Sequence, residues 1–531
     1  MTETSYDIVP YTSHALSQTH PDRLAALARL FGMRPRDITQ SRILEIGCGD
    51  GSNLIPMSYG LPHSELIGID MAEGAISSGQ EIQGLLGLKN LRLLAMDLMD
   101  VDDAMGLFDY IICHGVFSWV GGDAREKILG ICRNNLAPQG VAYVSYNIYP
   151  GWHLRNMVRG MMRFHTDHFP DPKQKVSQAR AILQFIAEAV PESLESYRKV
   201  LTSELQQIMD SEILFHDDLA EINHPLYFHE FMAMAEEHGL KFLAESDFFE
   251  MQDQFFDDPV RETLKRLSGQ DILVKEQFMD FIKGRRFRQT LLHHAGETLN
   301  RRLQPGTMEG FLFSCPARPV DGEGKYLEGN GQDLLTREDL HFRRPRGSTI
   351  GTDHPVPRAA LLTLSKIWPA RLHFDQLLAV GRELARQFAR EQGLPDRKDS
   401  EEDPVALGDV LLSAFSANMV EIHVHSPRFS EQISSRPVAS PYARIQAQKS
   451  TRVTNLCHKT IELKDTYGRI LLPLLDGALG MDDIRAKALK RIRDRDLSLK
   501  GNRASEKTDS TLLEEIDEEL RNCARHALLI A

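Results

Sequence analysis

The fold of this chain is decided by the stretch Arg42-Ile43-Leu44-Glu45-Ile46-Gly47-Cys48-Gly49-Asp50-Gly51. Its first five residues predict a short, mostly apolar strand, and a helical segment begins near Ser52. Glycines between a strand and a helix allow a tight turn, and they let a ligand approach the backbone because no Cβ holds it away. The stretch therefore predicts the first strand and the ligand loop of an α/β fold.

Short apolar runs recur after this loop, and helical segments separate them. The expected further strands cover residues 66–70, 91–95, 108–113 and 141–145. A helix that starts at Pro21 and stops at Gly32 precedes the first strand, and the turn Pro138-Gln139-Gly140 precedes the fifth. Alternating strands and helices predict a parallel sheet covered on both faces, with the ligand site beyond the carboxyl ends of the strands.

Two acids indicate which ligand the loop binds. Asp70 ends the predicted second strand, where a carboxylate can accept hydrogen bonds from both hydroxyls of a ribose. The glycine spacing is G-x-G-x-G and not the G-x-G-x-x-G of dinucleotide sites. Glu45 would repel a pyrophosphate but suits a cationic, amine-bearing ligand such as S-adenosylmethionine. The alternative is a doubly wound fold that binds no cofactor.

The same segments resemble the motifs of class I methyltransferases. Glu45 with its three glycines resembles the first motif, and the run 108–115 resembles the fourth. The run 136–140 resembles the family's L-x-P-G-G turn, from which Gln139 departs. The resemblance implies a Rossmann-like sheet and S-adenosylmethionine as cofactor. The cofactor residues it implies are Glu45, Gly47, Gly49, Gly51, Asp70, Asp97 beside the adenine amino group, and His114.

The N-terminal arm at residues 5–21 resembles that of a bacterial group of methyltransferases with an additional regulatory domain. Further matches lie at residues 118–120, 144–152 and 223–231, so the resemblance spans at least residues 5–295. The group includes protein-lysine methyltransferases that act on outer-membrane proteins. The resemblance implies an N-terminal lid with Tyr11 and His20 as cofactor contacts, although both side chains could equally pin the arm to the domain.

Candidate acceptor-binding residues follow the fourth and fifth predicted strands. Aromatic faces stabilise an ammonium group by about 0.5 to 2 kcal/mol, and Tyr or Asn oxygens can orient an amine. The cluster therefore suits a lysine acceptor, although its aromatic members could be ordinary packing residues. The N-P-P-Y motif of many amino-methylating enzymes is absent after strand four. The predicted catalytic residues are His114, Trp119, Tyr146 and Asn147.

The remaining chain predicts a helical insertion and C-terminal domains. Expected units are a cofactor-binding core at 1–152, a helical insertion and regulatory region at 153–298, and C-terminal domains at 299–531. Strands near 240–245 and 287–292 would complete a seven-stranded sheet. Two helical stretches and the strand 419–424, within residues 358–425, are in an order compatible with a winged-helix unit, which we expect to dock a protein and not DNA.

The composition indicates where the protein is located and which classes of partner it binds. The net charge of −13 argues against nucleic-acid binding, and no apolar run is long enough to span a membrane. The N-terminus carries an acid where a signal peptide needs basic residues, and six scattered cysteines predict reduced thiols. No metal-ligand spacing is present. We therefore expect a cytoplasmic protein without a metal.

The leading functional hypothesis is an S-adenosylmethionine-dependent methyltransferase that modifies lysine side chains of proteins. A small-molecule methyltransferase is the first alternative, and a cofactor-binding regulator without turnover is the second. The expected partner is a protein substrate, with a small-molecule acceptor as the alternative. The sequence leaves a homo-oligomer open.

Overall fold

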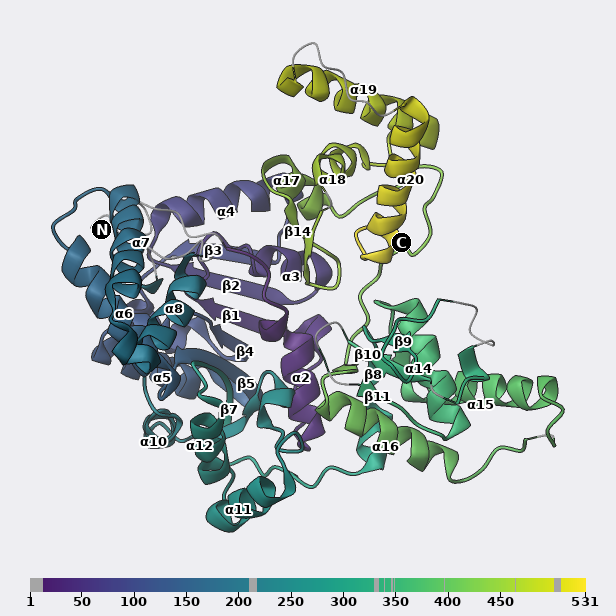
Figure 1. Cartoon of the computed structure of the whole chain (residues 1–531), viewed down its shortest axis with the longest axis horizontal. Helices are drawn as coiled ribbons and strands as arrows, with labels where there is room; N and C mark the ends of the chain where they lie inside the picture. The colour runs from purple at the N-terminus through teal and green to yellow at the C-terminus, as the bar shows by residue number, and fades with distance from the viewer. Residues whose placement is uncertain are drawn as a thin grey trace.

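A seven-stranded mixed sheet forms the centre of the computed structural model (Figure 1), which describes residues 13–209, 217–328, 334–338, 340–344, 347, 349–395, 397–463, 465–500 and 508–531. The strand order is β3-β2-β1-β4-β5-β7-β6. Strands β1 to β5 run parallel to one another, while β7 is antiparallel to both β5 and β6. The strands are β1 (Arg42–Ile46), β2 (Glu65–Asp70), β3 (Leu91–Ala95), β4 (Phe108–Cys113), β5 (Leu136–Asn147), β6 (Leu240–Glu245) and β7 (Phe287–His294).

This sheet confirms the predicted Rossmann-like fold class. Chain order reverses at β1, because β2 and β3 lie on one side of it and β4 and β5 on the other, which is where such sheets bind ligands. The helices of this part are α2 (Pro21–Leu30), α3 (Leu54–Gly60), α4 (Glu73–Leu86) and α5 (Gly122–Asn134). Helix α2 starts at Pro21 as predicted, and Gly32 follows it with a φ of 87°.

Strand β5 starts earlier than predicted, at Leu136, so the expected turn at 138–140 forms the start of the strand. Gln139 adopts a φ of 61°, a left-handed conformation that is uncommon for residues other than glycine. Its side chain is held in place, since its amide donates to the Glu297 carboxylate and its Oε1 accepts from the backbone of Arg34 at 2.7 Å. These contacts let glutamine occupy the place of the glycine in the L-x-P-G-G turn.

The segment between β5 and β6 is helical, as predicted. Helices α6 (Gly151–Thr166), α7 (Pro172–Ala189) and α8 (Glu195–Met209) pack around a small core of their own that includes Val158, Met162 and Leu183. Helix α10 (Phe228–Glu237) leads into β6. Helices α11 (Asp258–Ser268) and α12 (Ile272–Lys283) connect β6 to β7.

The C-terminal half forms two further units (Figure 1). The first, from residue 305 to 424, shares the core of the main sheet. It contains two three-stranded sheets, β11-β10-β9 and β12-β8-β13. Its elements are β8 (Leu312–Ser314), β9 (Arg318–Val320), β10 (His341–Arg343), β11 (Thr349–Ile350), α14 (Pro355–Ile367), β12 (Leu372–His373), α15 (Phe374–Glu391), α16 (Asp403–Ser416) and β13 (Glu421–His423).

The last unit, which we call the C-terminal unit, has a separate core that extends from Ala439 to Leu529. Its elements are α17 (Pro441–Lys449), β14 (Arg452–Thr454), β15 (Thr460–Glu462), α18 (Asp465–Leu471), α19 (Met481–Lys500) and α20 (Asp509–Arg525). Strands β14 and β15 form an antiparallel hairpin. The 3-10 helices used below are η1 (Ser17–Thr19), η3 (Leu98–Asp100) and η5 (Phe117–Trp119).

Two expectations from composition can be compared with this structure. All six cysteines are buried free thiols, as expected for reduced cysteines. Within the described ranges, no helix combines the length and the apolar character needed to cross a bilayer.

Candidate active site

The glycine loop joins β1 to α3 and turns sharply beneath the ends of the strands. Gly47, Gly49 and Gly51 have φ values of 74°, 55° and 73°, which lie in the left-handed region. At Gly47 a Cβ would also lie only 2.3 Å from Val116 Cγ2, so any other residue would force the Val116 side chain to move. The Gly47 N–H donates to the Ile69 carbonyl at 2.9 Å, which fixes the loop against the end of β2.

Asp70 ends β2 and is bonded to the same loop. Its Oδ2 accepts from the Gly49 N–H at 2.8 Å and its Oδ1 from the Ala72 N–H at 2.9 Å. The side chain is partly exposed, and each carboxylate oxygen has a second lone pair. Asp70 can therefore accept hydrogen bonds from ribose hydroxyls without losing its contacts to the loop.

Asp97 lies beside Asp70, because the Met96 N–H donates to the Asp70 carbonyl at 2.9 Å. Its Oδ1 caps η3 by accepting from the Met99 N–H at 2.9 Å. The residue is partly exposed at the strand ends. This position is compatible with the predicted contact to an adenine amino group.

Glu45 is almost fully buried behind the glycine loop, with 3% of its surface exposed. Its Oε1 accepts from the Asn53 amide at 2.8 Å, while its Oε2 has no hydrogen-bond partner among the described residues. Burial, reinforced by the nearby Asp70 and Asp50 carboxylates, raises the pKa of Glu45 to about 8. A buried acceptor with one unpaired oxygen fits the amine of S-adenosylmethionine.

The described part of the N-terminal arm lies along this loop. Ser13 approaches Gly49, and the Leu16 N–H donates to Asn53 Oδ1 at 2.9 Å. The imidazole of His20 caps α2 by accepting from the Asp22 N–H at 3.1 Å, and its ring centroid lies 4.9 Å from that of His458. These contacts pin the arm, which was the alternative role for His20. Tyr11 lies outside the described residues.

His114 follows β4 and has a partner that the sequence did not reveal. Its Nδ1 lies 2.8 Å from the hydroxyl of Tyr143, which donates to Gln289 Oε1 at 3.1 Å. Since the single Tyr143 proton is used there, His114 donates through Nδ1 and keeps a lone pair on Nε2. Burial lowers the pKa of His114 to about 4, so the ring is uncharged near neutral pH.

Trp119 and Asn147 lie on adjoining segments after β4 and β5. The Ser118 hydroxyl accepts from the Asn147 N–H at 2.8 Å, which joins the two strand ends. Asn147 donates from its side chain to Asn223 Oδ1 at 3.1 Å. Trp119 meets Trp152 edge to face, with centroids 6.1 Å apart. The structure therefore brings both predicted residues to one edge of the sheet.

An aromatic group continues this edge. Tyr149 stacks on His153 at a centroid distance of 4.0 Å and lies 5.3 Å from Tyr227. His153 Nε2 is 3.2 Å from the Tyr227 hydroxyl. Tyr149 and Tyr227 are partly exposed, so their rings are available to a substrate.

Tyr146 requires a correction, because the structure places its side chain in the core. Only 1% of the residue is exposed, and its ring stacks on Phe231 at 4.0 Å. Its hydroxyl lies 3.0 Å from Thr290 Oγ1, and burial raises its pKa. Successive side chains of a strand point to opposite faces, so Tyr146 lies opposite Tyr143 and Ser145. It is a packing residue.

Three segments of the chain match known families of protein domains. Residues 44–142 match a methyltransferase domain, residues 210–294 a predicted methyltransferase regulatory domain, and residues 435–528 the C-terminal winged helix domain of PKMT. An uncharacterized protein of Rickettsia prowazekii is 37% identical over 379 residues, which cover 70% of this chain and 67% of that protein. A second one is 38% identical over 242 residues, which cover 45% of this chain and 96% of the relative.

A solved structure extends the match to the whole chain. It is that of PKMT2 from Rickettsia typhi in complex with AdoHcy, with 28% identity and a TM-score of 0.83. The similarity covers 98% of this chain and 100% of PKMT2. The chain belongs to this family of S-adenosylmethionine-dependent methyltransferases.

The domain matches correct the predicted position of the winged-helix unit. The winged-helix match lies at 435–528, in the C-terminal unit, and not at 358–425. The earlier segment does contain helices and short strands, namely α14, α15, α16, β12 and β13, but its strands pair with β8 and its core is that of the main sheet. The two segments differ in the order of their elements, which is α14-β12-α15-α16-β13 in the earlier one and α17-β14-β15-α18-α19-α20 in the later one.

Proposed function

We propose that this methyltransferase transfers the methyl group of S-adenosylmethionine to lysine side chains of protein substrates. The observation that carries the proposal is the similarity to PKMT2 along 98% of the chain, together with the PKMT winged-helix match. The cofactor region is 1–152. We assign the insertion and regulatory region at 153–298 and the C-terminal domains at 299–531 to selecting and holding the protein.

The residues around the glycine loop bind different parts of the cofactor. Asp70 holds the ribose, Asp97 the adenine amino group, and Glu45 the amine, while Gly47, Gly49 and Gly51 give the ligand room against the backbone. When bound, S-adenosylmethionine supplies a methyl group on a positively charged sulfur. The chain must then hold an amine lone pair in line with that methyl group and keep water away from it.

The edge formed by η5 and the end of β5 suits a lysine side chain. The faces of Trp119 and Tyr149 attract an ammonium group. Asn147 and the Nε2 lone pair of His114 can orient the amine through hydrogen bonds. An uncharged His114 does not repel a cationic acceptor, and desolvation between aromatic rings favours loss of the lysine proton. Methyl transfer requires that proton to leave before the nitrogen lone pair can react.

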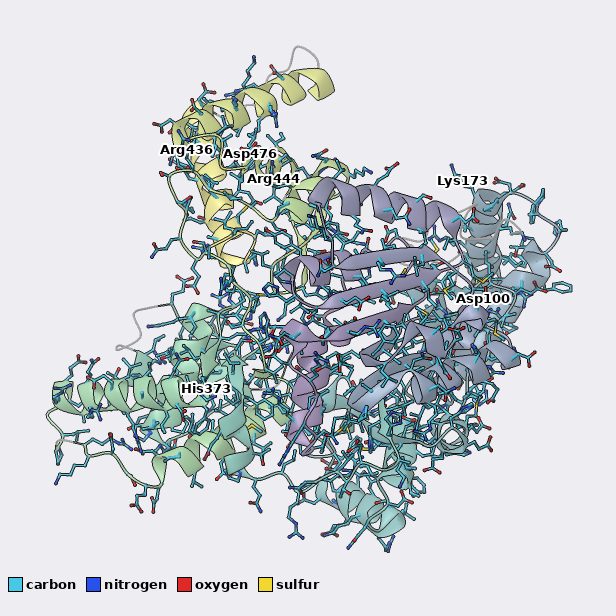
Figure 2. The ribbon with its side chains drawn as sticks, turned by 180° about the vertical axis from the view of Figure 1, so that it is seen from behind. Asp100, Lys173, His373, Arg436, Arg444 and Asp476 are labelled. Atoms are coloured by element: carbon cyan, nitrogen blue, oxygen red, sulfur yellow. The ribbon has the colours of Figure 1, made fainter. Side chains whose placement is uncertain are left out.

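We also propose that the enzyme acts in the cytoplasm and that its partners are proteins and not nucleic acids. Six buried free thiols support a reducing compartment. The net charge of −13 opposes binding to a phosphate backbone. Basic residues of the C-terminal unit lie near acidic ones, since Arg444 is 3.6 Å from Asp476 (Figure 2).

The proposal is tested by incubating the protein with methyl-labelled S-adenosylmethionine and fractionated bacterial lysate. We expect the label on protein bands, including those of an outer-membrane fraction. Label confined to small molecules would overturn the protein acceptor. Binding of AdoHcy without any transfer of label would indicate a regulator and would also overturn the proposal.

A further inference from the structure

Asn53 is the residue at which the N-terminal arm and the C-terminal unit both contact the cofactor loop. Its amide Nδ2 donates to Glu45 Oε1 at 2.8 Å and to Thr19 Oγ1 at 2.9 Å. Its Oδ1 accepts from the Leu16 N–H at 2.9 Å and lies 2.9 Å from His458 Nε2. Asn53 is 5% exposed. The orientation of the Glu45 carboxylate therefore depends on a residue of the C-terminal unit that lies 405 positions from Asn53 in the sequence.

His458 is presented to Asn53 by an unusual backbone conformation. It lies in the turn 455–459 between β14 and β15, with a φ of 57°, which non-glycine residues rarely adopt outside constrained sites. The turn is held by Asn455, whose Oδ1 accepts from the backbone of Cys457 at 3.0 Å and of Lys459 at 2.8 Å. The His458 residue is 5% exposed, and its Nδ1 has no partner among the described residues.

Because Asn53 Oδ1 can only accept, His458 donates through Nε2. Burial lowers the pKa of His458 well below its ordinary value, so the ring carries a single proton, and that proton is on Nε2. The one polar contact that the ring makes within the described chain is therefore directed at the loop of the cofactor site.

Two further contacts join the same surfaces. Tyr442 on α17 is 2% exposed, and its hydroxyl lies beside Ser52, the residue before Asn53. Thr460, next to the turn on β15, donates to the Ala15 carbonyl of the arm at 3.4 Å. The C-terminal unit thus contacts both the segment after the glycine loop and the arm that lies over it.

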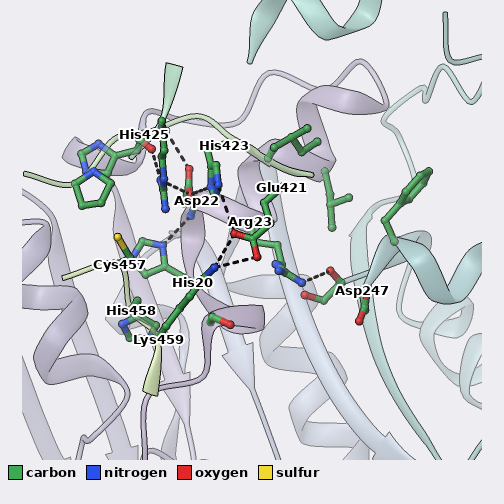
Figure 3. Close-up of a pocket in the computed structure, with 18 of the residues that line it drawn as sticks. His20, Asp22, Arg23, Asp247, Glu421, His423, His425, Cys457, His458 and Lys459 are labelled. Atoms are coloured by element: carbon green, nitrogen blue, oxygen red, sulfur yellow. Dashed lines mark hydrogen bonds and ion pairs between the residues drawn. The ribbon is translucent and has the colours of Figure 1, made fainter. Parts of the chain in front are cut away.

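Charged residues hold the turn in this position (Figure 3). Lys459 lies 2.7 Å and 2.9 Å from the two carboxylate oxygens of Glu421 on β13. Asp22 on α2 accepts from His423 Nδ1 at 2.7 Å and from the Val424 N–H at 2.8 Å. Helix α2, strand β13 and the turn 455–459 are therefore fixed to one another beside the cofactor loop.

We propose that His458 is a positioning residue for the cofactor and that the C-terminal winged-helix unit completes the cofactor site. His458 holds Asn53, and Asn53 holds the Glu45 carboxylate toward the cofactor amine. Coupling of this kind is reciprocal, so a bound cofactor also strengthens the seating of the C-terminal unit on the sheet. This role of His458 concerns the binding of the cofactor and does not depend on the identity of the methyl acceptor.

The test uses the full-length variant H458G and calorimetric binding of AdoHcy, which requires no acceptor. Glycine adopts a φ of 57° without strain, so the turn is preserved while the hydrogen bond to Asn53 is lost. We expect AdoHcy to bind about three- to tenfold more weakly, the usual effect of losing one such bond. The KM for S-adenosylmethionine should rise by the same factor with kcat unchanged.

Two companion variants separate this role from a general loss of structure. Y442F removes the hydroxyl that contacts Ser52 without altering the turn, and we expect a similar loss of AdoHcy affinity. R452A changes an exposed residue of the same hairpin, which pairs across it with Glu462, and we expect it to bind like the wild type. The proposal is overturned if H458G and Y442F both bind AdoHcy with the affinity of R452A.

Discussion

At the scale of single residues, the cofactor loop combines two carboxylates in different environments. Asp70 is partly exposed and accepts two backbone hydrogen bonds, whereas Glu45 is buried with one oxygen unpaired among the described residues. Burial disfavours the ionised form of Glu45. The two acids are thus suited to different parts of one ligand, the ribose hydroxyls and the amine.

We predict that D70A weakens AdoHcy binding by about a hundredfold or more. The variant loses the ribose hydrogen bonds, and bonds to a charged group contribute about 1.5 to 3 kcal/mol each. It also loses the contact with the Gly49 N–H. Calorimetry measures the change, and D100N, a nearby surface acid (Figure 2), is the control that should bind normally. An affinity within twofold of the wild type would contradict the placement of the ribose.

Glu45 should make both cofactor affinity and stability depend on pH. Its pKa of about 8 lies above the ordinary 4.5, so the folded protein holds a proton that the unfolded chain loses between these values. The stability that Glu45 contributes is therefore fully present below pH 4.5 and is lost as the pH rises toward 8. An amine ligand requires the ionised form, so AdoHcy affinity should rise over the upper part of this range.

The matching variant is E45Q. It cannot ionise, so chemical denaturation at pH 6 and pH 8 should show a smaller loss of stability than in the wild type. Its AdoHcy affinity should be lower at pH 8 and nearly independent of pH. A wild-type pH profile in E45Q would show that another group controls binding.

At the scale of elements, a buried arginine holds the antiparallel end of the sheet together. Arg288 on β7 lies 2.6 Å from Glu245 on β6 and 2.9 Å from Glu276 and Asp280 on α12. Its guanidinium also lies 3.8 Å from the centre of the Phe228 ring. These contacts fasten the regulatory segment to the strands that carry the acceptor edge.

R288M should destabilise the protein by about 3 to 5 kcal/mol, because it deprives buried Glu245 of this cation and leaves Glu276 and Asp280 to pair with Arg285. Urea denaturation measures the loss, with R261A as the control, since Arg261 is exposed on α11. If R288M matches R261A in stability, the cluster contributes no net free energy to the fold.

The elements of the sheet also show which features can be predicted from the sequence and which cannot. The strands of the sheet were predictable because each is a short apolar run that packs between helices. The early start of β5 was not, since it depends on the contact of Gln139 with Glu297, 158 positions away. The buried position of Tyr146 depends on the pairing register of β5, which the sequence of the strand does not specify. The pair of Asn53 and His458 has no local signal at all.

At the scale of the whole molecule, Asp22 joins the cofactor-binding part to the unit formed by residues 305–424. It lies 2.9 Å from Arg371 and 2.7 Å from His423. Although burial alone would raise the pKa of Asp22, these two neighbours hold it well below its ordinary value. The stability that Asp22 contributes is present above pH 3.8 and is lost as the pH falls below that value.

We expect D22N to lower the free energy of unfolding at pH 7 by about 3 kcal/mol, since it removes the buried partner of Arg371. The difference from the wild type should shrink below pH 3.8, because Asp22 takes up a proton in the unfolded chain while its lowered pKa keeps it ionised in the native protein. Denaturation curves at pH 3 and pH 7 measure both effects. D375N, which changes an exposed acid on α15, is the control, and equal stability of the two variants would contradict the role of Asp22.

The central claim is that a protein lysine receives the methyl group, and amino-acid analysis tests it most directly. Protein substrates labelled by the wild-type enzyme are hydrolysed completely, and the labelled products are separated. We expect label in methyllysine, and much less of it when D70A replaces the wild type at limiting cofactor. Label recovered only in other methylated residues, or equally in the D70A sample, would contradict it.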